Sequence, residues 1–126
     1  MTTLRIDYDG RQFRSVGNSG TGEVGNATVF RYHQTGDIVW ATYAGGAIRF
    51  GTLIAIASPD GGLDMRYQHL NDRGEFKSGR CRSTPELLPD GRLRLHEKWT
   101  WTESRDAESG NSVIEEVHDS IPNPRP

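Results

Sequence analysis

The stretch RLRLHEKWTWT, residues 92–102, decides the fold class because its side chains alternate between two kinds. Alternation with period two is typical of a β-strand that buries one face. The apolar face would carry Leu93, Leu95, Glu97, Trp99 and Trp101, and the other face Arg92, Arg94, His96, Lys98 and Thr100. The stretch therefore predicts a half-buried strand and defines which side of the sheet faces the core.

Turn signals recur along the rest of the chain and separate further strand-like runs. Examples are Tyr8-Asp9-Gly10, Pro59-Asp60-Gly61 and Pro89-Asp90-Gly91, and the chain has 15 glycines in all. Runs of β-rich residues between such turns indicate a strand meander. With Leu4–Tyr8 and Gln12–Val16 before the central strands and Ser112–Glu116 after them, we count about eight strands, enough to close a small barrel. The predicted fold is all-β, a single antiparallel meander that closes into a small barrel.

Turn lengths predict which residues face one another. A three-residue turn at Pro89 to Gly91 sets Glu97 opposite Ser83 and, on the same face, Trp99 opposite Cys81 and Trp101 opposite Gly79. Large side chains then face small ones, as close packing requires.

The same reasoning, carried backward, predicts the inner wall of the barrel. A two-residue turn at Asp60-Gly61 pairs Tyr67 with Ile54, Met65 with Ile56 and His69 with Thr52. Three-residue turns at Ala44 to Gly46 and at Gln34 to Gly36 pair Phe50 with Trp40 and Trp40 with Phe30. The expected inner aromatic residues are Phe30, Tyr32, Trp40, Phe50, Tyr67, Trp99 and Trp101.

Composition and charge exclude several classes of protein. The 126 residues fit one domain, which we place at residues 1–117, followed by a flexible proline-rich tail at 118–126. The net charge is −2 and no basic block occurs, so no nucleic-acid partner is expected. No apolar run reaches membrane-spanning length, and we expect no membrane partner. Without a signal-peptide pattern, and with Cys81 as the single cysteine, we expect a cytoplasmic protein.

Glu97 is the most unusual residue of the predicted inner wall, because it lies between Leu95 and Trp99 on an apolar face. A buried carboxylate has to be paired, hydrated or protonated. It could anchor a ligand or act as a general acid or base with a raised pKa. The structural alternative is a carboxylate at the barrel rim, or one bonded to Ser83 or to an arginine.

The other candidate groups have simpler interpretations. His69 lies near a strand end and could transfer a proton, or could be a rim residue bonded to backbone. Cys81, opposite Trp99, is expected to be a buried and inert thiol. The four histidines show no metal-ligand spacing, so we expect no metal and no cofactor.

Three functions fit these predictions. The first is binding of a small, partly apolar ligand in an interior pocket of a few hundred Å³, with Glu97 as polar anchor. Its lining would be Tyr32, Trp40, Phe50, Tyr67, Glu97, Trp99 and Trp101. The alternative is a cofactor-free isomerase or cyclase that uses Glu97, His69 and Tyr67 in the same pocket, so enzymatic activity is left open. The third is a homo-oligomer formed through an outer sheet face, which ranks last because those faces look charged. Whether the interior is a pocket or a filled core is also left open.

Several segments resemble a known group of proteins. They are residues 8–14 (YDGRQFR), 64–69 (DMRYQH), 83–86 (STPE) and 95–101 (LHEKWTW). Over residues 7 to 117 they resemble a family of short bacterial proteins that often carry the automatic label "N-acetylglutamate synthase". That label implies an α/β fold with a pyrophosphate-binding turn before a helix, and this sequence has neither feature, so we judge the label wrong.

The predicted architecture resembles the calycins, which include lipocalins, fatty-acid-binding proteins and avidins. The Gly-x-Trp signature of lipocalins is absent. The resemblance implies a ligand-binding barrel but assigns no ligand residues.

Overall fold

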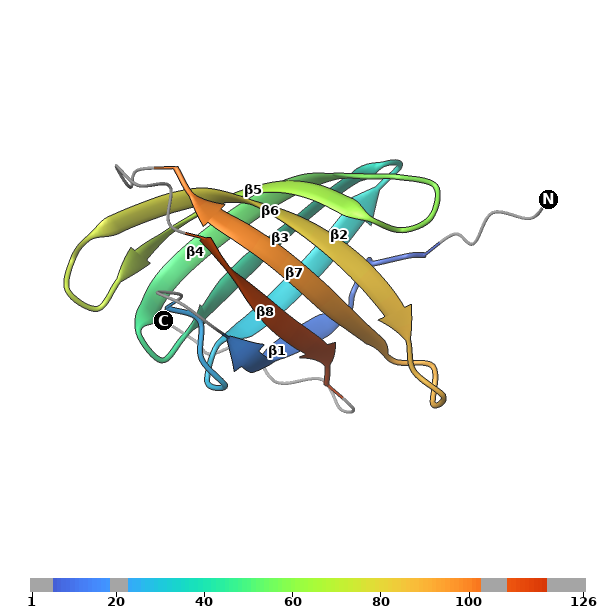
Figure 1. The fold of residues 1–126 in the computed structure, drawn as a ribbon, viewed down its shortest axis with the longest axis horizontal. Coiled ribbons are helices and arrows are strands. Elements are labelled where there is room, and N and C mark those ends of the chain that lie inside the picture. The colour runs from blue at the N-terminus through green and yellow to red at the C-terminus, as the bar shows by residue number, and fades with distance from the viewer. Residues whose placement is uncertain (1–5, 19–22, 103–108, 118–126) are drawn as a thin grey trace.

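Eight antiparallel strands follow one another around a closed barrel in the computed structural model of the protein (Figure 1). Each strand pairs with the next and β8 pairs with β1, so the sheet has no free edge. The structure describes residues 6–18, 23–102 and 109–117. The strands are β1 (Gln12–Asn18), β2 (Val29–Thr35), β3 (Ile38–Gly45), β4 (Ile48–Ala57), β5 (Leu63–Asn71), β6 (Phe76–Leu87), β7 (Leu93–Trp101) and β8 (Ser109–Glu116).

The predicted all-β meander that closes into a small barrel is confirmed. No helix long and apolar enough to cross a membrane occurs in the described part of the chain. The tail predicted at 118–126 lies outside the described residues.

The segment before β1 closes one end of the barrel. Tyr8 is fully buried, and its hydroxyl donates a hydrogen bond to the carbonyl of Gly61 in the β4–β5 loop. Its ring lies 5.8 Å from that of Tyr32, which in turn contacts Phe13 at 4.9 Å between ring centroids. The strand predicted at Leu4–Tyr8 is therefore wrong for residues 6–8, which form an end plug, while residues 4 and 5 lie outside the described part.

The register of β6 and β7 agrees with the prediction. Glu97 faces Ser83, and the two pairs that follow it on the inner face are those expected, Trp99 with Cys81 and Trp101 with Gly79. The inward face of β5, which starts with Leu63 and Met65, is also as predicted.

The predicted register of β3 and most of β4 is wrong. Trp40 pairs with His33 and Ile54 rather than with Phe30 and Phe50. Against β2, the reason is the intervening turn, which has two residues, Gly36 and Asp37, because Thr35 pairs with Ile38. Against β4, the turn is Gly46 and Ala47, because Gly45 pairs with Ile48, and a β-bulge precedes it. Gly36 adopts φ 61°, a backbone conformation that favours glycine in a tight turn. A turn shorter by one residue moves every side chain of β3 to the opposite face.

The register of β4 against β5 is also shifted by one residue. The β4–β5 connection spans Ser58 to Gly62 instead of two residues, so Tyr67 pairs with Leu53 and not with Ile54. This error reverses the change of faces that the turn after β2 introduced. The assignment of faces is therefore correct again from β5 onward.

The outer face of β3 and β4 is apolar, which contradicts the expectation that the outer faces are charged. The exposed side chains there include Ile38, Trp40, Ile54 and Ile56, which are between 39% and 58% exposed. Ile38 pairs with Ile56, and Trp40 pairs with Ile54, so the four side chains form one patch. This patch is referred to below as the β3–β4 patch.

Candidate functional site

A cavity of about 50 Å³ lies at the end of the barrel away from Tyr8. It is well below the few hundred Å³ that we predicted, because inner aromatic side chains fill most of the space. The lining residues among those described are Asn18, Glu23, Val24, Phe30, Tyr43, Leu53, Met65, Tyr67, His69, Cys81, Glu97, Trp99, Trp101 and Ser112. The interior is thus a packed core that keeps a small pocket at one end.

Glu97 places a buried carboxyl group at this pocket. Its side chain comes from the inner face of β7 and the residue is 9% exposed. The Oγ atom of Ser112 on β8 donates a hydrogen bond to Oε1 of Glu97 at 3.1 Å. Ser83 faces Glu97 from β6, and its Oγ atom is buried without a hydrogen-bond partner among the described residues. The sequence had suggested Ser83 or an arginine as the partner of Glu97. The described cavity lining contains no arginine, and the serine that bonds to Glu97 is Ser112.

The environment of Glu97 disfavours its charged form. Burial raises the pKa of Glu97 to about 7, and the hydrogen bond from Ser112 counteracts this only in part. The side chain is therefore a mixture of acid and carboxylate near neutral pH. Such a group can donate a hydrogen bond, accept one, or balance a positive charge.

Aromatic rings form most of the wall around the pocket. Ring contacts run from Tyr43 through His69 to Trp101, with centroids 5.7 and 5.8 Å apart. Trp101 also contacts Tyr67 at 5.7 Å and Trp99 at 5.6 Å. These edge-to-face and tilted arrangements are favourable for aromatic pairs. The pocket is therefore apolar around its sides and polar at Glu97.

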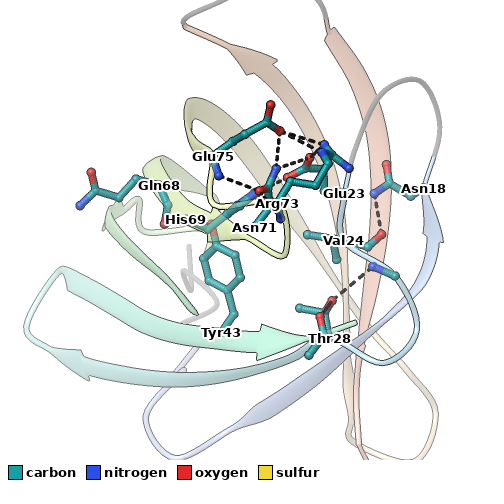
Figure 2. Close-up of polar contacts among 12 residues, drawn as sticks. Asn18, Glu23, Val24, Thr28, Tyr43, Gln68, His69, Asn71, Arg73 and Glu75 are labelled. Carbon is teal, nitrogen blue, oxygen red and sulfur yellow. Dashed lines mark hydrogen bonds and ion pairs between the residues drawn. The ribbon is translucent and has the colours of Figure 1, made fainter. Parts of the chain in front are cut away.

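His69 connects the pocket wall to a polar network at the mouth (Figure 2). Nδ1 of His69 lies 3.0 Å from the hydroxyl of Tyr43, and Nε2 lies 2.8 Å from Oε1 of Glu23. Because a carboxylate only accepts hydrogen bonds, Nε2 donates to Glu23. Both ring nitrogens thus contact side chains. One predicted alternative, a rim histidine bonded to backbone, does not describe these two contacts.

Glu23 attaches the segment before β2 to the β5–β6 hairpin. Besides His69, its carboxylate accepts hydrogen bonds from Nδ2 of Asn71 at 3.0 Å and from Nη2 of Arg73 at 3.0 Å. Burial alone would raise the pKa of Glu23, but the hydrogen bonds from His69 and Asn71 outweigh it and the net pKa is lowered. Glu23 is therefore a stable carboxylate at the edge of the pocket.

The sequence-predicted residues fall into three groups. Tyr67, His69, Glu97, Trp99 and Trp101 come together around the cavity. Tyr32 is buried, but it lies at the Tyr8 end and not in the described lining. Trp40 and Phe50, 39% and 54% exposed, lie on the outer face, so their predicted place inside the barrel is wrong.

Two important residues of the site were missed. Tyr43 points inward because β3 has the opposite parity to the one predicted, and the alternation of Val39, Ala41 and Tyr43 was the signal that could have revealed it. Glu23 lies in a loop and contacts His69, which is 46 residues away. No local pattern predicts such a contact.

A closed eight-stranded barrel with a pocket at one end defines a class of small barrels able to hold one small ligand. A family model described as "Avidin-like protein" matches residues 6–117, and the chain belongs to this avidin-like family. The family agrees with the calycin-like architecture expected from the sequence. Searches among curated proteins and among solved structures gave no significant match.

Proposed function

We propose that the protein binds a small, partly apolar molecule, one end of which enters the pocket between Trp99, Trp101 and Glu97. The observation that carries the proposal is the buried carboxyl of Glu97 at an aromatic-walled cavity. A few well-placed polar groups in an apolar concavity are typical of ligand sites. Membership of the avidin-like family supports a role in binding small molecules.

The size of the cavity limits what can enter it. A space of about 50 Å³ accepts a few water-sized groups, so the inserted part of the ligand has only a handful of non-hydrogen atoms. Larger parts of the ligand would lie at the mouth, near Glu23 and His69.

A pair of substitutions on adjacent residues of β4 tests the proposal. Leu53 lines the cavity, whereas Ile54 is 58% exposed on the outer face. We expect native mass spectrometry of the full chain, purified from its source cells, to show a retained small molecule. Leu53→Phe should fill the pocket and abolish retention, and Ile54→Phe should leave it intact. Circular dichroism checks that both variants fold. Equal retention by Leu53→Phe and the parent protein would refute the pocket as the binding site.

The enzymatic alternative, with Glu97, His69 and Tyr67 as catalytic residues, stays a prediction. His69 is a poor candidate for proton transfer to a substrate, since both ring nitrogens are bonded to Tyr43 and Glu23. Glu97 keeps the properties needed for acid–base chemistry, but a raised pKa fits a binding group equally well.

The β3–β4 patch supports the homo-oligomer that the sequence left open. A two-fold interface brings the same patch of two copies together and requires a surface that complements itself. Ile38, Trp40, Ile54 and Ile56 carry no charge that would repel its own copy. Analytical ultracentrifugation should show a larger species for the parent protein than for Ile54→Lys. Identical sedimentation of both as monomers would contradict this association.

A further inference from the structure

We propose that the ligand carries a positive charge: the pocket is built to receive a small organic ammonium group, paired with the carboxylate of Glu97 and surrounded by aromatic rings. This inference rests on the proposed function and specifies its ligand class. Three independent observations of the described residues carry it.

The first observation is the charge of the pocket lining. It contains two carboxyl groups, Glu97 and Glu23, and neither arginine nor lysine among the described residues that form it. Its imidazole, His69, is already bonded to Glu23. At the mouth, Glu23 is also paired with the guanidinium of Arg73, so the uncompensated negative charge of the lining is that of Glu97. That charge would repel an anionic ligand and attract a cation.

The second observation is the incomplete pairing of Glu97. The hydrogen bond from Ser112 satisfies part of the carboxylate, but a neutral hydroxyl does not balance a buried charge. Among the described residues, the titratable groups whose pKa the charge of Glu97 raises are a thiol and four phenols, and no positive group contributes to the pKa of Glu97 itself. They are Cys81 on β6, Tyr32 on β2, Tyr43 on β3, Tyr67 on β5 and Tyr8 of the end plug. A cation from outside would supply the missing charge.

The third observation is the wall of connected rings. Trp99 and Trp101 follow Glu97 on the same face of β7, and Tyr43 and Tyr67 complete the surroundings. Aromatic faces attract cations, and tryptophan does so most strongly. A carboxylate beside several rings is a combination that favours an ammonium group over a neutral group of equal size.

The ionisation of Glu97 agrees with this assignment. Burial raises the pKa of Glu97 to about 7, so about half of the empty molecules carry the carboxylate at neutral pH. A bound cation stabilises the charged form and would lower that pKa. Binding of an ammonium ion should therefore strengthen as the pH rises. A neutral hydrogen-bond acceptor bound to protonated Glu97 should show the opposite dependence.

The test compares three probes of similar size: n-propylammonium, 1-propanol and propionate. Binding is followed by NMR through the indole N–H signals of Trp99 and Trp101, with the outward-facing Trp40 as an internal reference. We expect n-propylammonium to bind at least about tenfold more tightly than 1-propanol at pH 8. Its affinity should fall about tenfold from pH 8 to pH 6, the change in ionised fraction for a group with a pKa of about 7.

Substitutions separate Glu97 from general electrostatics and from His69. Glu97→Gln should remove the preference for n-propylammonium over 1-propanol. Asp64→Asn, which removes the same charge from the outer face of β5, should preserve it. His69→Gln should leave the pH dependence in place, because that dependence is assigned to Glu97.

The outcomes distinguish the ligand class from the function itself. If 1-propanol or propionate binds as tightly as n-propylammonium, the cationic ligand is refuted and the small-molecule pocket stands. If Glu97→Gln binds n-propylammonium as tightly as the parent protein does, the role of the carboxylate is refuted. If no probe shifts the signals of Trp99 and Trp101 relative to Trp40, both the ligand class and the proposed pocket are contradicted.

Discussion

The hydroxyl of Tyr43 on β3 lies 3.0 Å from Nδ1 of His69 on β5, directly above Gly51. Gly51 belongs to β4, the strand between them, and pairs with both residues. The glycine leaves the space that the phenol ring occupies. Two side chains on non-adjacent strands can therefore form a hydrogen bond across the inner face of the sheet. The same arrangement recurs where Tyr67 and Trp101 meet on either side of Gly79.

Gly51→Ala should destabilise the protein and disrupt this contact. A Cβ atom at Gly51 would lie 2.4 Å from Cζ of Tyr43 and 2.8 Å from Cβ of His69, so the ring has to move. Overpacking of this kind costs about 1–3 kcal/mol, measurable by chemical denaturation. Gly17→Ala in β1 is the control, because no atom of the described residues lies within 4 Å of the added atom. Equal stability of the two variants would show that the ring tolerates displacement.

Glu23→Gln should loosen the segment before β2. The carboxylate accepts charge-assisted hydrogen bonds from His69, Asn71 and Arg73, and their loss should cost about 1–3 kcal/mol at pH 7. The pKa of Glu23 is lowered in the folded protein, so its stabilising effect is present above the unfolded pKa and lost as the pH falls through the folded value. The difference between parent and variant, measured by chemical denaturation, should therefore shrink below about pH 4.

The more exposed Glu75 provides the control for Glu23. It bonds to the same Asn71 and Arg73, but its side chain is 51% exposed against 12% for Glu23. At pH 7, Glu75→Gln should lower the free energy of unfolding less than Glu23→Gln does. A larger effect of Glu75→Gln would mean that the hairpin, rather than the segment of Glu23, depends on this network.

Tyr8 and Tyr32 provide a contrast within the closed end of the barrel. The hydroxyl of Tyr8 donates to the carbonyl of Gly61, whereas the hydroxyl of Tyr32 is buried without a hydrogen-bond partner among the described residues. Tyr8→Phe should cost about 1–2 kcal/mol, since it leaves a buried carbonyl unsatisfied, while Tyr32→Phe should be neutral or stabilising. Thermal denaturation of both variants measures the difference. A destabilised Tyr32→Phe variant would reveal a partner for that hydroxyl.

The sequence was informative wherever one face of a strand is clearly apolar and the other charged. Residues 92–102 have that character, and so the inner face of β7 and the positions of Glu97, Trp99 and Trp101 could be predicted. Strand β3 has apolar side chains on both faces, with Trp40 outside and Tyr43 inside. Its orientation depends on the length of the turn at Gly36, which composition does not determine.

Contacts between distant segments limited the prediction of the site. Glu97 was identified because a carboxylate stands out on an apolar strand, but its bond to Ser112 depends on how β8 pairs with β7. The contact between Glu23 and His69 joins a loop to a strand end and leaves no periodic signal. The cavity volume depends on how the inner rings pack, and a list of inward positions overestimates it.

Glu97→Gln should make the protein more stable at alkaline pH, in contrast to most substitutions of buried residues. The pKa of Glu97 is raised to about 7, so between the unfolded value near 4.5 and pH 7 the folded protein binds more protons than the unfolded chain. Stability of the parent protein therefore falls as the pH rises through this window. A pKa shift of that size corresponds to about 3 kcal/mol at pH 8. The glutamine has no charge to desolvate, and Ser112 and Ser83 can bond to its amide.

Chemical denaturation from pH 5 to pH 8 should show a nearly flat profile for Glu97→Gln and a declining one for the parent, with the two curves approaching each other near pH 5. Parallel profiles would mean that Glu97 ionises in the folded protein as it does in the unfolded chain, and that the pocket holds no buried charge for a ligand to balance.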